Sequence, residues 1–138
     1  MKYRYTSFFP PEKNLKWIKR PMVEIEIFGP QGSKKFMALV DSGADYSLFN
    51  IQVAQLLGFD LSKAKPRSFI GIIGNISAHM LDNIEIKVEG VEKSAKIPVS
   101  FVESETVGLI LGEEGFFDQY RIRFEKDHDI FEITPVKK

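Results

Sequence analysis

Short stretches in which apolar and polar residues alternate recur along this chain, and a period of two is typical of half-buried β-strands. Such stretches cover residues 22–28, 34–40, 83–89, 94–101, 107–111, 121–125 and 129–133. The stretch at 107–111 is apolar throughout instead of alternating. Turn sequences such as Gly29-Pro-Gln-Gly-Ser33 separate them. Pro98 has no N–H to donate, so we expect its strand to lie at a sheet edge or a bulge.

Two segments have helical character. Asn50 can cap a helix over Ile51-Gln-Val-Ala-Gln-Leu-Leu57, and Gly58 can end it. Residues 113–119 predict a second short helix with acidic residues at its positive N-terminal end. At least seven strands, one or two short helices and no repeat predict an all-β, closed, barrel-like domain.

The first 21 residues differ from the rest in composition. They are polar and aromatic, they are interrupted by Pro10 and Pro11, and they end at Pro21. We therefore divide the chain into an N-terminal arm, residues 1–21, and a single domain, residues 22–138. The aromatic side chains of the arm need a surface to pack on, which is either the arm's own domain or a second subunit.

Composition and charge exclude several classes of function. The 138 residues correspond to about one domain, and 19 basic residues balance 19 acidic ones, so nothing predicts nucleic acid or an anionic membrane as partner. The absence of cysteine excludes thiolate sites and disulfides, and two histidines are too few for a histidine-rich metal site. We predict no cofactor. Without an apolar signal-peptide core or a membrane-length apolar run, a cytoplasmic location is the simplest expectation.

The most informative stretch is the loop Leu39-Val-Asp-Ser-Gly-Ala-Asp45. A carboxylate placed directly after a buried strand, as Asp41 is, is costly unless it is hydrogen-bonded or functional. Ser42 adds a hydroxyl, and Gly43 adds freedom to adopt unusual backbone angles in a tight turn. Taken alone, the three residues also fit an ordinary turn in which Asp41 accepts backbone hydrogen bonds.

A second notable stretch is Phe69-Ile-Gly-Ile-Ile-Gly-Asn75, in which Gly74-Asn75 is a strong hairpin-turn signal. Ile72 and Ile73 at its tip predict an exposed apolar patch that would pack over another surface or a bound molecule. With Gly71 and Gly74 as hinges, the hairpin fits a lid that excludes water from a bound molecule. The alternative is a plain hairpin whose isoleucines pack on the barrel.

In this order, the parts resemble the retropepsin family, the single-domain aspartic proteases typified by retroviral proteases. The loop Leu39-Val-Asp-Ser-Gly-Ala-Asp45 matches the catalytic loop, Phe69-Ile-Gly-Ile-Ile-Gly-Asn75 the flap, and Leu109-Ile-Leu-Gly112 the second buried strand. The resemblance spans residues 22–133. It implies that Asp41 is the catalytic aspartate and that the Ser42 hydroxyl bonds across a dimer axis beside Gly43. It further implies substrate contacts from Ala44, Asp45, Gly71, Ile72, Ile73 and Gly74.

The chemistry of this family requires two carboxylates that share one proton. Two carboxylates a few ångströms apart cannot both ionise, so one serves as general base on a water while the other donates to the scissile carbonyl. The chain has one Asp-Ser-Gly, so the dyad requires a homodimer with Asp41 from each subunit. The sequence thus predicts an aspartic endopeptidase acting on extended polypeptides. The alternative is an inactive peptide-binding or dimerisation module of the same fold.

One residue departs from the family pattern. The family often pairs the equivalent of Asp45 with an arginine just after the glycine of the second buried strand, but Glu113 stands there in this chain. Arg67, Arg121 and Arg123 are the candidates to replace that arginine.

Overall fold

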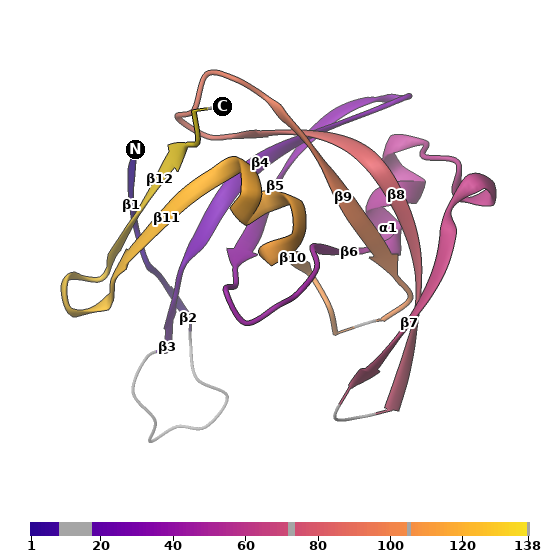
Figure 1. The fold of residues 1–138 in the computed structure, drawn as a ribbon, viewed down its shortest axis with the longest axis horizontal. Coiled ribbons are helices and arrows are strands. Elements are labelled where there is room, and N and C mark those ends of the chain that lie inside the picture. Colours follow the sequence, from indigo (N-terminus) through magenta and orange to yellow (C-terminus); the bar gives the residue numbers. More distant parts are fainter. Residues whose placement is uncertain (9–17, 72–73, 105, 138) are drawn as a thin grey trace.

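Six strands of the structure, a computed structural model that describes residues 1–8, 18–71, 74–104 and 106–137, close into a barrel (Figure 1). In ring order they are β4 (Met22–Gly29), β5 (Gly32–Val40), β10 (Leu109–Leu111), β6 (Leu48–Asn50), β9 (Ala95–Val102) and β8 (Gly74–Val88). The ring closes because β8 also pairs with β4. This confirms the predicted all-β, barrel-like fold.

The strand β7 (Lys65–Gly71) lies outside the ring and pairs with β8 as a hairpin, with Gly71 opposite Gly74. The sequence predicted a hairpin turn at Gly74-Asn75 and a separate strand at 83–89, but β8 runs through both without a break, and a register shift between Leu81 and Ile84 interrupts its pairing with β9. Pro98 of β9 lies opposite this shift, which confirms its expected place at a bulge.

The helices are short. In α1 (Ile51–Leu57), the Asn50 side chain accepts from the Gln52 N–H at 2.9 Å and Gly58 ends the helix in the left-handed region, as predicted. The second predicted helix is the irregular turn η2 (Glu113–Phe117), where Gly115 has φ of 87°. Two single turns, η1 (Leu61–Lys63) and η3 (Lys126–His128), complete the helical part of the described residues.

A second sheet is built from the two ends of the chain. Its order is β1 (Lys2–Arg4), β12 (Ile130–Pro135) and β11 (Tyr120–Glu125), and a separate ribbon pairs β2 (Thr6–Phe8) with β3 (Ile18–Arg20). β11 and β12 were predicted, but β1, β2 and β3 were not. Each is only three residues long, and β1 exists because it pairs with the far end of the chain. The division at residue 21 stays a prediction.

The barrel interior is a continuous apolar core. On β4 the alternation predicted from the sequence is observed, since Val23, Ile25 and Ile27 are buried while their neighbours are not. The largest buried side chains include Phe49, Phe101, Phe116 and Phe131. No helix within the described ranges is both long and apolar enough to cross a membrane.

Candidate active site

The Asp41 carboxylate lies at the end of two adjacent parallel strands. β5 and β10 run parallel, with Leu39 opposite Ile110 and Val40 opposite Leu111. Asp41 is the first residue after β5, and its N–H donates to the Leu111 carbonyl oxygen at 3.0 Å. Since both strands belong to the barrel ring, this pairing fixes the backbone of Asp41 while its half-buried side chain remains accessible.

The Asp-Ser-Gly turn holds the carboxylate in place. The Gly43 N–H donates to Asp41 Oδ1 at 2.9 Å, and the Ala44 N–H donates to the Asp41 carbonyl oxygen at 3.3 Å. A Cβ on Gly43 would lie 3.3 Å from Oδ1, which is tight. Gly43 is not among the glycines with positive φ. Glycine is favoured here because the N–H must approach the carboxylate closely.

The loop that follows rests on the backbone of η2. Gly112 N–H donates to the Ser47 hydroxyl at 3.0 Å, and Ser47 is buried. The next two N–H groups, of Glu113 and Glu114, donate to the carbonyl oxygens of Ala44 at 2.8 Å and Asp45 at 2.9 Å. These bonds explain Gly112, because a Cβ there would lie 2.3 Å from the Tyr46 carbonyl oxygen.

None of the three candidate arginines pairs with Asp45 within the part of the chain that the structure describes. Arg67 lies 4.7 Å from the Tyr46 ring centroid and 3.8 Å from a Glu114 carboxylate oxygen, and Arg123 pairs with Glu125. Glu113 meets Ala44 through its backbone and leaves its exposed side chain outside any described ion pair. None of the three candidates therefore replaces the family arginine at Asp45. Arg67 instead contacts Tyr46, the residue that follows Asp45.

An open hollow of about 310 Å³ lies in front of the Asp-Ser-Gly turn. Besides Asp41 and Ser42 it is lined by Tyr5, Arg20, Pro21, Leu39, Val40 and Phe124. Sequence reasoning missed Tyr5, Arg20 and Phe124. The register of the β4–β5 hairpin could have indicated Arg20. Met22 pairs with Leu39 in this antiparallel hairpin, so Arg20, two residues before Met22, falls opposite Asp41, two residues after Leu39. For Tyr5 and Phe124 no local signal exists.

The predicted flap residues are only partly described. Gly71 and Gly74 face each other at the end of the β7–β8 hairpin, whereas Ile72 and Ile73 lie outside the described residues. Figure 1 places the outer end of this hairpin at the same end of the barrel as the loop between β5 and β6. Arg67, on β7, is the described contact between the hairpin and that loop.

The acidic residues of the site do not form a metal centre. Within the described ranges, no three His, Cys, Asp or Glu side chains gather closely enough to hold a metal ion. His128, which the sequence places between two aspartates, has its Nε2 at 3.3 Å from a carboxylate oxygen of Asp127. The chemistry available at Asp41 is that of a carboxylate with one backbone donor and an open front.

The structure combines a closed β-barrel with an Asp-Ser-Gly turn at the end of β5, beside the parallel strand β10, which is consistent with the aspartyl proteases of the retropepsin-like clan. A family model described as aspartyl protease matches residues 23–114, which is more than half of the chain, so the chain belongs to the aspartyl protease family. No match to a curated protein was found. The matched range contains Asp41 and Glu113 but leaves out β1 to β3 and β11 to β12.

Proposed function

We propose that this protein is an aspartic endopeptidase that hydrolyses peptide bonds in extended polypeptide segments as a homodimer. The observation that carries the proposal is the Asp41 carboxylate, held by the Gly43 N–H at 2.9 Å and open to a hollow in front of it. A single such carboxylate performs neither half of the reaction alone. The second one comes from a second copy, because the sequence has one Asp-Ser-Gly.

The reaction follows from a proton shared by two Asp41 carboxylates. The ionised carboxylate removes a proton from a water, whose oxygen then attacks the scissile carbonyl carbon, while the protonated carboxyl gives its proton to the carbonyl oxygen. The resulting tetrahedral diol then collapses: the carboxyl that took the proton from water gives it to the nitrogen, the C–N bond breaks and the amine leaves, and one hydroxyl of the diol returns its proton to the other, ionised carboxylate. The apparent pKa values belong to the pair rather than to either aspartate.

The remaining site residues have supporting roles in this proposal. Ser42, exposed at the turn, bonds across the dimer axis, and Gly43 holds Asp41. Ala44 and Asp45, fixed by the backbone of η2, bind the peptide backbone. The hairpin from Gly71 to Gly74, with Ile72 and Ile73 at its tip, closes over the peptide and excludes water.

The test is Asp41→Asn, which keeps the size of the side chain and its hydrogen bond from Gly43 but cannot ionise. We expect it to abolish cleavage of a denatured protein at mildly acidic pH while the chain stays folded and dimeric. Asp82→Asn is the matched control, because Asp82 is an exposed aspartate whose weak ion pair with Lys65 lies away from the turn. Cleavage that survives Asp41→Asn contradicts the proposal.

The alternative is an inactive peptide-binding or dimerisation module. One feature favours it: two acids, Asp45 and Glu113, stand where the family has an acid and an arginine. Fluorescence anisotropy with a labelled peptide distinguishes the two. A binding module holds the peptide equally well with Asp41 or Asn at position 41 and releases no product, whereas the enzyme turns the peptide over.

A further inference from the structure

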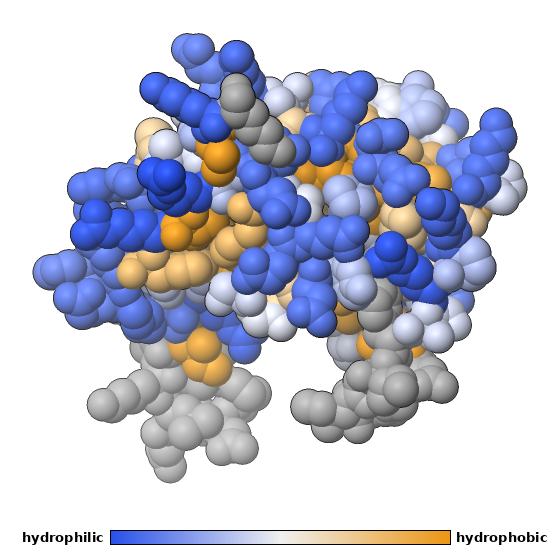
Figure 2. All heavy atoms as spheres, in the orientation of Figure 1, coloured by the Kyte–Doolittle hydropathy of each residue, from blue (hydrophilic) through white to orange (hydrophobic). Residues whose placement is uncertain are grey.

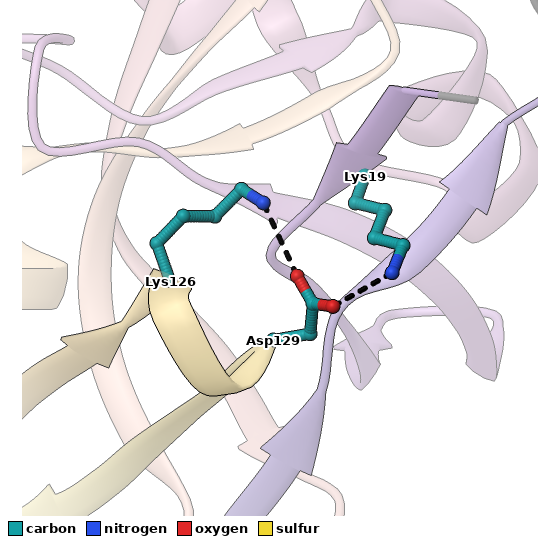
Figure 3. Close-up of polar contacts among 3 residues, drawn as sticks. All are labelled: Lys19, Lys126 and Asp129. Atoms are coloured by element: carbon teal, nitrogen blue, oxygen red, sulfur yellow. Dashed lines mark hydrogen bonds and ion pairs between the residues drawn. The ribbon is translucent and has the colours of Figure 1, made fainter. Parts of the chain in front are cut away.

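The ribbon of β2 and β3 is fixed to the rest of the chain at the root of each strand. The Tyr5 N–H donates to the Asp129 carbonyl oxygen at 2.8 Å, and Lys19 Nζ donates to Asp129 Oδ2 at 2.6 Å. Figure 3 shows Lys126 on the other carboxylate oxygen, at 3.1 Å. The hydrogen bond from Lys19, with that from Lys126, lowers the pKa of Asp129. The ribbon is therefore a fixed projection of the fold.

Beyond this anchor, the last pair of the ribbon that the structure describes is apolar and exposed. Phe8 lies directly opposite Ile18, and their exposed fractions are 38% and 40%. Within the described residues, β2 and β3 pair with each other and with no third strand. Figure 2 shows hydrophobic side chains at the outer end of this ribbon, at the lower left. A lone two-stranded ribbon is marginal in water, so a partner surface for this pair is expected.

The face that carries the apolar pair continues into the active-site hollow. Residues two apart on a strand, such as Ile18 and Arg20, share a face, as do directly opposite residues such as Ile18 and Phe8. The Arg20 guanidinium lies 6.0 Å from the centroid of the Phe8 ring, and Arg20 lines the hollow in front of Asp41. The ribbon face and the hollow are thus one continuous surface.

The position of the proposed two-fold axis determines which molecule covers this surface. For two Asp41 carboxylates to share a proton they must come within about 3 Å of each other, so the two-fold axis passes beside Asp41. The hollow lined by Tyr5, Arg20 and Phe124 is then covered by the second copy of the chain. The ribbon face that bears Phe8 and Ile18 extends outward from this hollow. It therefore faces the same second copy.

We propose that the β2–β3 ribbon is an intersubunit arm, and that its face bearing Phe8 and Ile18 packs on the partner subunit of the homodimer. The inference rests on the proposed function for the position of the two-fold axis. By symmetry each dimer contains two such contacts, so each substitution in the arm acts twice on the dimer. The ribbon lies outside residues 23–114, the range that the aspartyl protease family model matches.

The first test measures dimer affinity by sedimentation equilibrium. We expect Phe8→Asp with Ile18→Asp to raise the dimer dissociation constant about a hundredfold or more, because four apolar side chains per dimer lose their cover. The matched control is Met37→Asp with Leu56→Asp, since Met37 and Leu56 are 49% and 51% exposed on other elements. The proposal is overturned if the arm variant dimerises like the wild type, or if the control weakens the dimer equally.

The second test asks which subunit the arm touches. Because the chain has no cysteine, Ile18→Cys gives a unique attachment point for a benzophenone photo-crosslinker. We expect a covalent dimer from position 18 and none from Leu56→Cys; products linked only within one chain overturn the proposal. A wild-type chain that stays monomeric overturns both the arm and the dyad. A dimer that requires the arm but cleaves nothing contradicts only the proposed peptidase activity.

Discussion

The guanidinium of Arg67 lies 4.7 Å from the centroid of the Tyr46 ring, and this contact joins the β7–β8 hairpin to the loop between β5 and β6. The same guanidinium lies 3.8 Å from a carboxylate oxygen of Glu114, whose N–H binds the Asp45 carbonyl oxygen. One side chain therefore connects the hairpin, the loop and η2. Tyr46 follows Asp45 directly, so Arg67 contacts the loop next to the residue proposed to bind substrate.

Arg67→Ala is expected to loosen the hairpin over the cleft. A cation–π contact of this kind contributes about 1 kcal/mol, so we expect KM for a peptide to rise about fivefold. The value of kcat should change less, because Asp41 keeps its hydrogen bond from Gly43. Arg67→Lys should restore only part of the effect, since a lysine keeps the charge but loses the planar stacking on Tyr46.

Steady-state kinetics on one peptide separate the two constants. Arg123→Ala is the control, because Arg123 is more exposed and pairs with Glu125 on its own strand. A fall in kcat with KM unchanged, or an equal effect from Arg123→Ala, would show that Arg67 does not position the hairpin.

The two glycines that flank β10 should respond differently to substitution by alanine. A Cβ at Gly112 would lie 2.3 Å from the Tyr46 carbonyl oxygen and 2.8 Å from that of Ala44, both backbone atoms. We expect Gly112→Ala to lower the free energy of unfolding by about 3 kcal/mol. At Gly108 no atom lies within 4 Å of such a Cβ, so Gly108→Ala should be neutral. Urea denaturation measures both, and equal values would contradict the role assigned to Gly112.

The barrel strands and the position of the Asp-Ser-Gly turn were predictable because their determinants are local. The alternation at 22–28 marks β4, the Asn50 and Gly58 caps delimit α1, and Asp41 follows directly from the end of the β5 pattern. Pro98 marked its bulge because proline donates no hydrogen bond. In each case the residue carries the physical reason for its own conformation.

The surroundings of the site were not predictable because they depend on long-range pairing. β12 pairs with β1 on one side and with β11 on the other, and this sheet brings Tyr5, just after β1, and Phe124, on β11, to the hollow. Arg67 reaches Tyr46 through the fold of β7, and no sequence spacing reports that contact. The irregular η2 depends on Gly115, which packs against Pro98 of a distant strand.

Two tyrosines near the terminal sheet should respond differently to loss of their hydroxyl groups. The Tyr3 hydroxyl donates to the Glu89 carbonyl oxygen, so Tyr3→Phe should lower the free energy of unfolding by about 1 kcal/mol. The Tyr120 hydroxyl is buried, with no protein hydrogen-bond partner among the described residues. Tyr120→Phe should therefore leave stability unchanged or raise it by about 1 kcal/mol. Thermal unfolding decides, and a loss from Tyr120→Phe as large as from Tyr3→Phe would contradict this difference.

The anchor of the arm should weaken in acid. Lys19 and Lys126 lower the pKa of Asp129 from its ordinary value of 3.8. A carboxyl whose pKa is lower in the folded state stabilises the fold above its unfolded-state pKa, and this contribution disappears as the pH falls through the folded-state value. Asp129→Asn removes the charge, and asparagine tolerates the left-handed backbone of this residue, with φ of 53°.

We therefore expect Asp129→Asn to speed amide exchange in β2 and β3 at neutral pH. The difference from the wild type should shrink below about pH 4 and vanish in stronger acid, because Asp129 is then protonated in both states. Asp127→Asn is the matched control, since Asp127 lies in the same turn, more exposed, and contacts His128 instead of the arm. Hydrogen exchange followed by mass spectrometry at several pH values measures the effect. If the difference persists unchanged in acid, the charge of Asp129 does not hold the arm.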